Sequence, residues 1–558
     1  MSRRRIRRFM EGAADASEVQ EKLLMNCVRN ATGTVYGREH GFSHIRSSDE
    51  FRRSVPINSY EDLRPYIDRE AGGEKNVLLN PSDRLVMFAR TSGTTGRPKL
   101  LPITASFRRE QQVSFRIWSA SCLEHHPHIL NGYILAVTDS VHESQTAAGV
   151  PVGSISGLIA QRQDLLTLRI YTVPQAVSRI RHANARYYTL MRIALTSDVS
   201  FLVTANPSTL LLLARLTDER KESLIRDIHD GELAVRHEVP NHLIRQIRRG
   251  LTRNAKRARE LENFINKRGQ LLPIDYWPNL ALIACWKGGP LKLFLNCLPA
   301  FYGHVPIRDL GLLASEGRMS IPFSDHGSEA ILNIKGAFYE FVPESERQET
   351  IGRKTLLAHE VERGRNYYLI LTSCNGLFRY DIQDVVRIEG FEGTTPIISF
   401  VNKGQHIASI TGEKVSEYQI VTAVQEAVRK GAFTRFIVCP AWDILPYYTV
   451  ITEELDAQRV NNWAVTLEAI DHRLRELNVE YASKRNSGRI DSMRLTLVPN
   501  GTLASMNSIC VHDSQFKQIY LRSEIDYHRR YPHIGQIYSA GATSQEESRT
   551  SVATANFT

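Results

Sequence analysis

The chain has 558 residues, of which 42% are hydrophobic and 23% are charged. These proportions are typical of a folded globular protein, and they exclude a largely disordered or collagen-like chain. The 70 Lys and Arg residues exceed the 60 Asp and Glu residues, so the formal net charge is +10, which favours anionic partners such as nucleotides, acidic substrates, nucleic acids or anionic membranes.

Strands and helices alternate along the first part of the chain. The apolar periodicity predicts helices at 17–30, 105–122, 174–196 and 208–229, and strands at 85–89, 133–137, 200–204, 280–285 and 367–372. Such alternation is typical of α/β architecture. We therefore expect a large α/β domain over residues 1–400.

The pattern changes beyond this region. Helices are predicted at 416–430 and 457–484, with strands at 434–439, 446–451 and 493–498. These elements suffice for a small α+β domain, which we place at residues 401–538. Residues 539–558 are rich in Ser, Thr and Ala, so we expect them to form a disordered tail.

Basic residues gather in two stretches, Arg3–Arg8 and Arg236–Arg268. The second stretch carries Leu243, Ile244 and Ile247 at helical spacing, which predicts an amphipathic helix with a solvated basic face. No zinc-finger, RNP-type or heptad pattern accompanies it, so nucleic-acid binding is the weaker interpretation.

The seven cysteines are scattered, odd in number and never spaced as C-x-x-C. This argues against a disulfide framework or a structural zinc site and favours a reducing compartment. No segment reaches the ~20 uninterrupted apolar residues of a membrane helix, and no apolar segment of the signal-peptide type follows the basic N-terminus. We expect a cytoplasmic protein that does not insert into membranes.

The segment from Thr91 to Lys99 is the strongest chemical signal in the sequence. It reads Thr91-Ser92-Gly93-Thr94-Thr95-Gly96-Arg97-Pro98-Lys99 and directly follows a predicted strand. Glycines let such a loop approach a ligand closely, while its hydroxyl and backbone N–H groups can donate to phosphate oxygens. Lys99 adds a positive charge. The spacing differs from that of a Walker P-loop, and a purely structural polar turn is the less favoured interpretation.

This loop resembles the phosphate loop of adenylate-forming enzymes, and two later segments narrow the resemblance. Leu310–Gly317 looks like the Y-x-A-S-E motif of the auxin-responsive Gretchen Hagen type acyl-acid amido synthetases, and Gly376–Asp384 looks like their G-L-Y-R-Y-x-x-G-D motif. Further matches follow in family order at Phe338-x-Glu340-Phe341, Val361-Glu362-x-Gly364, Gly412-Glu413-Lys414-x-x-Glu417, Asn500-Gly501-Thr502 and Gln515-Phe516-Lys517. The ordered set extends over most of the chain.

The resemblance implies a large adenylate-forming domain followed by a smaller, mobile C-terminal domain. It implies that Ala314 and Ser315 contact ATP together with the Thr91–Lys99 loop, and that Glu316 helps to hold Mg²⁺ on the ATP phosphates. Asp384 would accept the ribose hydroxyls. Lys517 would stabilise the charge that develops at the α-phosphate, with Lys414 as its rival for that role.

The sequence departs from the family pattern in three of these segments. Leu312 stands where the family often has an aromatic residue, so stacking on adenine from this position is lost. Gln383 replaces the glycine before Asp384, and Asp381 adds a second acid nearby. After Lys517, the sequence continues with Gln518 and Ile519 instead of a segment that contains proline.

The implied reaction has two steps. ATP and a carboxylic acid give an acyl-adenylate and pyrophosphate, and an amine, most naturally an amino acid, then takes the acyl group and releases AMP. A thioester-forming ligase and a non-catalytic nucleotide-binding scaffold are the alternatives, and nucleic acid is not expected as a partner. We expect the acyl pocket to draw on 105–122 and 145–160. Gly153–Gly157 is not a hydrolase elbow, because its serines flank the required position.

Overall fold

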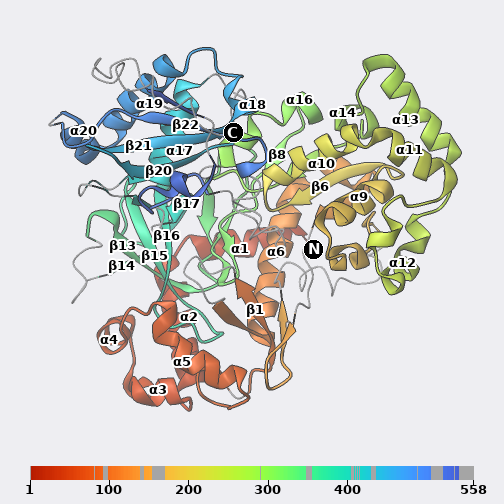
Figure 1. Ribbon diagram of the computed structural model, residues 1–558. Helices are drawn as coiled ribbons and strands as arrows, with labels where there is room; N and C mark the ends of the chain where they lie inside the picture. Colours follow the sequence, from red (N-terminus) through yellow and green to blue (C-terminus); the bar gives the residue numbers. More distant parts are fainter. Residues whose placement is uncertain are drawn as a thin grey trace. The chain divides into compact units, whose positions relative to one another are not determined.

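The computed structural model (Figure 1) consists of two compact units, formed mainly by Met1–Gly404 and by Gln405–Cys510. The structure describes residues 2–80, 82–91, 99–137, 144–153, 170–288, 291–346, 355–403, 407–408, 410, 413, 415–428, 435–486, 488–503, 519–532 and 535–538. No helix among these residues is both long enough and apolar enough to cross a membrane.

A seven-stranded sheet forms the centre of the larger unit. Its strand order is β11-β12-β17-β16-β15-β13-β14, and every neighbouring pair is antiparallel. The strands are β11 (Ser320–Ile321), β12 (Ala330–Leu332), β13 (Phe338–Pro343), β14 (Leu356–Leu357), β15 (Asn366–Thr372), β16 (Tyr380–Glu392) and β17 (Thr395–Lys403). Of these strands, the apolar pattern predicted only β15.

A smaller sheet carries the predicted phosphate loop. It has the order β2-β1-β5-β4, with β1 (Leu85–Thr91), β2 (Lys99–Thr104), β5 (Pro151–Gly153) and β4 (Ser144–Gln145). Met87, Phe88, Leu101 and Ile103 of this sheet belong to the same buried apolar cluster as residues of α2 (Ala16–Ala31), α5 (Tyr60–Ala71) and the seven-stranded sheet. The β1–β2 hairpin is therefore anchored by its packing against the main core.

The third sheet of the larger unit is parallel, as the alternating pattern predicts. It consists of β3 (Tyr133–Val137), β6 (Val199–Thr204), β7 (Leu282–Ala284) and β8 (Ile307–Arg308) in that order. Helices such as α9 (Ala183–Ala194) and α10 (Pro207–Glu219) connect its strands (Figure 1). The predicted α/β class is confirmed, with a large antiparallel sheet beside the parallel one.

Several predicted helices are divided in the structure. The expected helix at 208–229 is α10 followed by α11 (Lys221–Asp230), which ends at Gly231 with a left-handed φ of 81°. The expected helix at 174–196 is a 3-10 turn (Gln175–Arg179) followed by α9. The expected single helix at 457–484 is wrong, because α18 (Glu454–Ala457), α19 (Trp463–Leu477) and α20 (Val479–Asn486) replace it.

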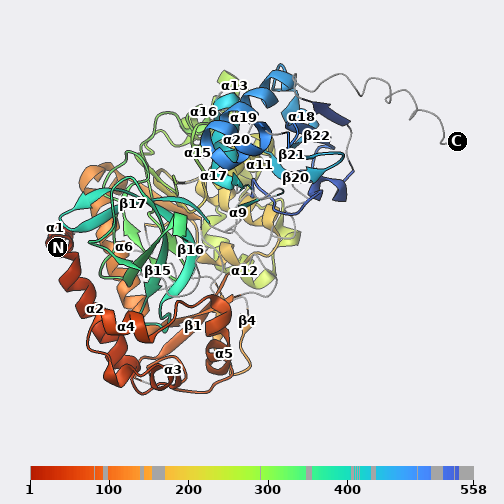
Figure 2. The ribbon, with the colours of Figure 1, turned by 90° about the vertical axis from the view of Figure 1, so that its left-hand side faces the viewer.

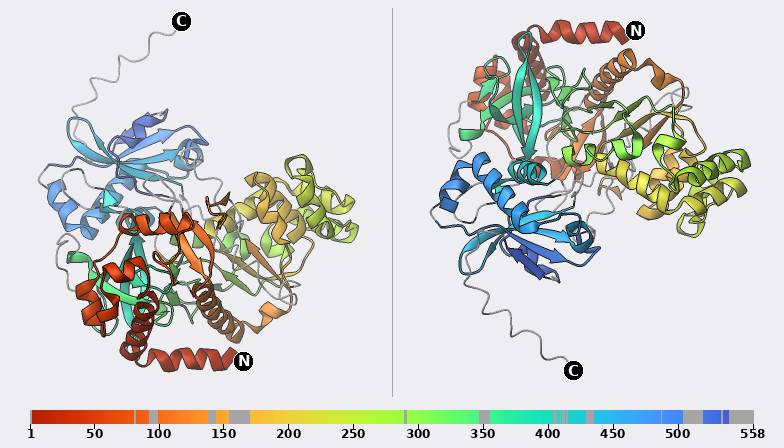
Figure 3. Two further views of the ribbon diagram at one scale, coloured as in Figure 1. Left: turned by 90° about the horizontal axis from the view of Figure 1, so that it is seen from below. Right: turned by 90° about the horizontal axis from the view of Figure 1, so that it is seen from above.

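The two basic stretches both form amphipathic helices. The first is α1 (Ser2–Ala13), which packs on α6 (Ala105–His125) through buried Phe9 and Ala13 (Figure 3). The second is broken into α12 (Asn241–Ile247) and α13 (Ala255–Arg268), with short 3-10 turns before and after α12. Leu243, Ile244 and Ile247 are buried, as their spacing predicts.

The smaller unit has a sheet of its own (Figure 2), with the order β20-β21-β22-β23. Its strands are β20 (Ile437–Trp442), β21 (Pro446–Glu453), β22 (Arg494–Val498) and β23 (Gly535–Tyr538). Helix α17 (Glu417–Ala427) packs against α19, and α19 packs against β22. This is the α+β arrangement that the sequence predicts; residues 539–558 lie outside the described part of the chain.

A buried ion pair joins two strands of the main sheet. Arg379, immediately before β16, donates from Nε and Nη2 to the two carboxylate oxygens of Glu340 on β13, at 2.9 and 2.8 Å. Their side chains are only 5% and 1% exposed. Arg379 Nη1 also donates to the carbonyls of Arg52 and Val55, each at 2.7 Å. The pair thus ties the start of β16 both to β13 and to the end of α4 (Ser48–Ser54).

We predict that Glu340→Ala lowers the free energy of unfolding of the larger unit by about 3–5 kcal/mol, because it leaves the Arg379 guanidinium buried without its carboxylate. Denaturant unfolding of the full chain measures this change. The matched control is Glu362→Ala, whose ion pair with Arg365 is 62% and 65% exposed and should contribute little. Equal losses in the two variants would contradict the structural role of the buried pair.

Candidate active site

The predicted phosphate loop connects two strands whose ends lie opposite each other. In the antiparallel pairing of β1 and β2, Thr91 is the partner of Lys99. The structure therefore places these two candidates side by side at the open end of the hairpin. The candidates between them lie outside the described residues: Ser92, Gly93, Thr94, Thr95 and Gly96.

Lys99 and the start of β2 are positioned by Tyr60. The Lys99 Nζ lies 5.4 Å from the centroid of the Tyr60 ring, within the range of a cation–π interaction. The Tyr60 hydroxyl accepts the N–H of Leu100 at 2.7 Å. Tyr60 is the first residue of α5, whose N-terminus is closed by a capping box of Ser59 and Asp62. The helix N-terminus thus holds the base of the predicted phosphate loop.

Glu316 lies in a tight turn between two short strands, β9 (Leu313–Ala314) and β10 (Gly317–Arg318). Ser315 is buried, with 7% of its surface exposed, whereas Glu316 is half-buried. The turn presents the carboxylate at a partly open position and holds its neighbour inside. This is suitable for a side chain that must reach a ligand.

A buried polar network supports this turn from α6. The Asn333 amide donates to the carbonyl of Arg318 at 2.9 Å, to Ser114 Oγ at 3.0 Å and to Glu110 Oε1 at 3.1 Å. Glu110 also accepts the Gln111 amide at 2.8 Å. Burial raises the pKa of the Glu110 carboxyl, and these donors oppose the effect. Asn333 therefore links the strand beside Glu316 to α6.

The start of β16 is fixed by Asn58 in a similar way. Asn58 N donates to the Arg379 carbonyl at 2.8 Å, and Asp381 N donates to the Asn58 carbonyl at 2.9 Å. The Asn58 amide also donates to the carbonyl of Phe378 and to the hydroxyl of Tyr36, each at 2.7 Å. Backbone and side chain together hold the strand that leads to Asp384.

Glu316 and Asp384 both act electrostatically on the phenol of Tyr380. Burial raises the pKa of Tyr380 well above its ordinary value. The negative charges of Glu316, Asp381 and Asp384 raise it further, as does Tyr60. The groups that act on this phenol therefore come from the turn, from α5 beside the hairpin base and from β16. Asp384 is only 2% exposed there.

Two acids of the smaller unit that belong to the matched family motifs form hydrogen bonds within that unit. Glu413 accepts the Tyr448 hydroxyl at 2.6 Å and the N–H of Ile410 at 2.8 Å. Glu417 accepts the N–H of Tyr520 at 2.8 Å. The two candidate lysines, Lys414 and Lys517, lie outside the described residues.

The expected acyl-pocket segments are described only in part. Helix α6 covers 105–122, with Phe107, Gln111 and Trp118 among its buried residues. Of 145–160, the structure describes 145–153. At the end of α6, His126 Nε2 lies 2.6 Å from Asp325 Oδ2. No group of three or more His, Cys, Asp or Glu side chains that could hold a metal ion occurs in the described ranges.

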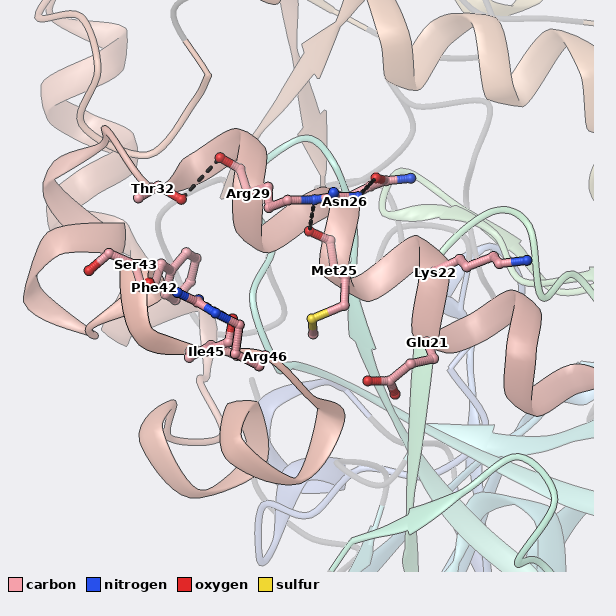
Figure 4. Close-up of a pocket in the computed structure, with 10 residues that line it drawn as sticks. All are labelled: Glu21, Lys22, Met25, Asn26, Arg29, Thr32, Phe42, Ser43, Ile45 and Arg46. Carbon is pink, nitrogen blue, oxygen red and sulfur yellow. Dashed lines mark hydrogen bonds between the residues drawn. The ribbon is translucent and has the colours of Figure 1, made fainter.

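A groove of about 770 Å³ lies away from these residues, between α2 and the segment Phe42–Arg46 (Figure 4). None of the sequence-predicted site residues lines it. Its two arginines are engaged locally: Arg29 Nε donates to the Met25 carbonyl at 3.2 Å, and Arg46 Nη1 donates to the Ser43 carbonyl at 2.8 Å (Arg29 in Figure 4). The groove therefore contains none of the residues that the sequence predicts for nucleotide binding.

The chain combines a larger unit that contains parallel and antiparallel sheets with a smaller α+β unit. Its sequence matches the GH3 family N-terminal domain over residues 5–307, the GH3 family central domain over 330–403 and the GH3 family C-terminal domain over 418–520. The chain belongs to the GH3 family. The resemblance seen in the motifs is thereby confirmed.

Relatives match over nearly the whole chain. The sequence is 24% identical to a jasmonoyl–L-amino acid synthetase, JAR6 of Nicotiana attenuata, over 89% of each chain. It is 25% identical to an indole-3-acetic acid-amido synthetase, GH3.10 of Arabidopsis thaliana, over 90% of this chain and 91% of that protein. The acyl acid amido synthetase AtGH3.15, solved with 2,4-DB, has the same fold, with a TM-score of 0.84 at 20% identity over 97% of this chain and 98% of that one.

Sequence reasoning missed the residues that support the site. Tyr60, Asn58 and Asn333 lie outside the motifs, and their partners are distant in sequence. Only the capping box of Ser59 and Asp62 leaves a recognisable signal near them. An S-x-x-D pattern at this point could have indicated the helix start that carries Tyr60.

We predict that Asn333→Ala lowers the free energy of unfolding by about 1–3 kcal/mol, because the buried Glu110 carboxylate and the Arg318 carbonyl both lose a donor. Urea unfolding of the full chain measures the change. The control is Asn263→Ala, which removes an exposed amide from α13 and should leave the unfolding midpoint in place. An Asn333→Ala variant as stable as this control would contradict the supporting role of the network.

Proposed function

We propose that the protein is an ATP-dependent ligase that activates a carboxylic acid as an acyl-adenylate and transfers the acyl group to an amine, releasing AMP and pyrophosphate. The observations that carry the proposal are the electrostatic effect of both Glu316 and Asp384 on the Tyr380 phenol and the hydrogen bond by which Tyr60 holds the hairpin base. Membership of the GH3 family supports the same chemistry.

The nucleotide roles follow from the chemistry of each group. The buried Asp384 carboxylate would accept the ribose hydroxyls, because a charged acceptor binds hydroxyl donors strongly in a site shielded from water. The loop between Thr91 and Lys99 would donate to the phosphates, with Lys99 adding positive charge. Ala314 and Ser315 would line the nucleotide beside Glu316.

Magnesium fits the chemistry of this site. Glu316 offers half-exposed carboxylate oxygens, the donors that a hard cation prefers, and ATP phosphates and water would complete its coordination. Mg²⁺ would neutralise phosphate charge during the displacement of pyrophosphate. The negative charges of Asp381 and Asp384 near the same phenol make such neutralisation necessary for a polyphosphate ligand.

We also propose that the C-terminal part of the chain contributes a catalytic lysine. Lys517 would stabilise the charge that builds on the α-phosphate, and Lys414 is the alternative for this role. We place the large domain at residues 1–400, the small mobile domain at 401–538 and a disordered tail at 539–558. Motion of the small domain would first exclude water from the acyl-adenylate and then admit the acceptor.

An amide product is favoured over a thioester. One relative is named a jasmonoyl–L-amino acid synthetase and another an indole-3-acetic acid-amido synthetase. The substrates would therefore be a small carboxylic acid and an amino acid. A cytoplasmic location is consistent with the free thiols of the six described cysteines: Cys27, Cys122, Cys285, Cys297, Cys374 and Cys439.

The proposal is tested by pyrophosphate exchange into ATP with a panel of aromatic and aliphatic acids. We predict exchange that depends on both acid and Mg²⁺, followed by AMP release when amino acids are added. Release driven by coenzyme A alone would instead identify a thioester-forming ligase. ATP binding without exchange for any acid would identify a nucleotide-binding scaffold and contradict the proposal.

We predict that Asp384→Ala weakens ATP binding by about tenfold to a hundredfold, as expected for the loss of a charged hydrogen-bond acceptor. Isothermal titration calorimetry with ATP and Mg²⁺ measures the affinity. Glu392→Ala, at the far end of the same strand, is the control for loss of an acidic side chain. Unchanged ATP affinity in Asp384→Ala would contradict the ribose contact.

A further inference from the structure

The strand that carries Asp384 leaves its regular pairing just before this residue. Opposite β15, Asp381 is the partner of Ile370 and Val385 is the partner of Tyr368. The residues from Ile382 to Asp384 therefore stand opposite Leu369 alone. This is a bulge, which bends a strand and redirects the side chains within it.

Gln383, at the centre of the bulge, has a backbone φ of 62°. This is the left-handed region, which glycine enters freely and a residue with a long side chain enters at a cost. The family pattern has glycine at this position, whereas this chain has Gln383. Some other contact must therefore stabilise the backbone here.

Asp381 provides that contact. Its Oδ1 accepts the N–H of Gln383 at 2.7 Å, which is the side-chain-to-backbone bond of an Asx turn. Asp381 is held in turn by its own N–H, which donates to the Asn58 carbonyl at 2.9 Å. The carboxylate thus lies at a fixed point and binds the residue at the centre of the bulge, whose φ is positive.

We propose that Asp381 is a positioning residue for Asp384: its bond to the Gln383 N–H maintains the bulge that directs the Asp384 carboxylate to the ribose. The inference rests on the ribose contact of the proposed function. It also explains how Gln383 can stand where the family pattern has glycine. The aspartate compensates for the absent glycine.

The bond between Asp381 and the Gln383 N–H affects the nucleotide through the direction of the Asp384 side chain. The positive φ of Gln383 sets the direction in which the chain continues to Asp384. Asp384 returns to the sheet at this point, where its backbone pairs with Lys403 of β17. If Gln383 relaxed to an ordinary negative φ, the Asp384 side chain would turn from the place it shares with Glu316 and Tyr380.

The test compares the binding of ATP with that of 2′-deoxy-ATP by calorimetry, using the full chain with Mg²⁺. The ratio of the two dissociation constants reports the ribose contact, and a merely destabilised fold would not change it. We expect Asp381→Ala to weaken ATP binding by about tenfold, which corresponds to one hydrogen bond, and to move the ratio toward one. The melting temperature of each variant is measured in parallel.

Two further variants isolate the bond itself. Asp381→Asn keeps an Oδ1 acceptor without the charge, so it should retain the wild-type ratio. The double variant Asp381→Ala with Gln383→Gly should restore the wild-type ratio of dissociation constants, because glycine adopts the positive φ without a hydrogen bond from Asp381. Glu392→Ala serves as the control and should behave as the wild type does.

The outcomes separate the inference from the proposed function. A wild-type ratio in Asp381→Ala, with the ratio lost in Asp384→Ala, would overturn the positioning role alone. If Asp381→Asn moved the ratio of dissociation constants toward one as far as Asp381→Ala does, the positioning role would also be overturned. The charge of Asp381, and not its bond to the Gln383 N–H, would then maintain the ribose contact. A wild-type protein that binds both nucleotides equally would remove the ribose contact and overturn both.

Discussion

The buried pair of Arg379 and Glu340 fixes where β16 begins, and the candidate site depends on that point. Two charges can remain inside the core because the guanidinium makes two hydrogen bonds to the carboxylate and also donates to the carbonyls of Arg52 and Val55. Both residues belong to family motifs, yet neither reaches the nucleotide site in our account. Their function is to place the next residues, Tyr380 to Asp384, at a constant position in the sheet.

The charge distribution of the site explains why the chemistry needs cations. Glu316, Asp381 and Asp384 all act on Tyr380, so a triphosphate would meet considerable negative charge. A divalent metal at Glu316 and the ammonium group of Lys99 would compensate for it, while Asp384 is reserved for the neutral ribose. In the proposed function, the acids and the predicted phosphate loop would thus contact different parts of the nucleotide.

Local patterns in the sequence predicted the parts of this structure that local physics determines. The apolar strand before the glycine-rich loop is β1, and the run at 133–137 is β3. The antiparallel sheet was largely missed because β16 mixes charged and apolar residues, as Asp381, Asp384 and Arg387 show. The resemblance to the family implied roles for Glu316 and Asp384. Asn58 and Asn333 could not be found in this way, because their roles depend on partners that only the fold brings near.

The most direct measurement is a crystal structure of the full chain with AMP bound. Our account predicts the ribose hydroxyls within hydrogen-bond distance of the Asp384 carboxylate, and the phosphate between the end of the β1–β2 hairpin and Glu316. An AMP molecule bound elsewhere, or one whose ribose is held by other residues while Asp384 faces away, would contradict it.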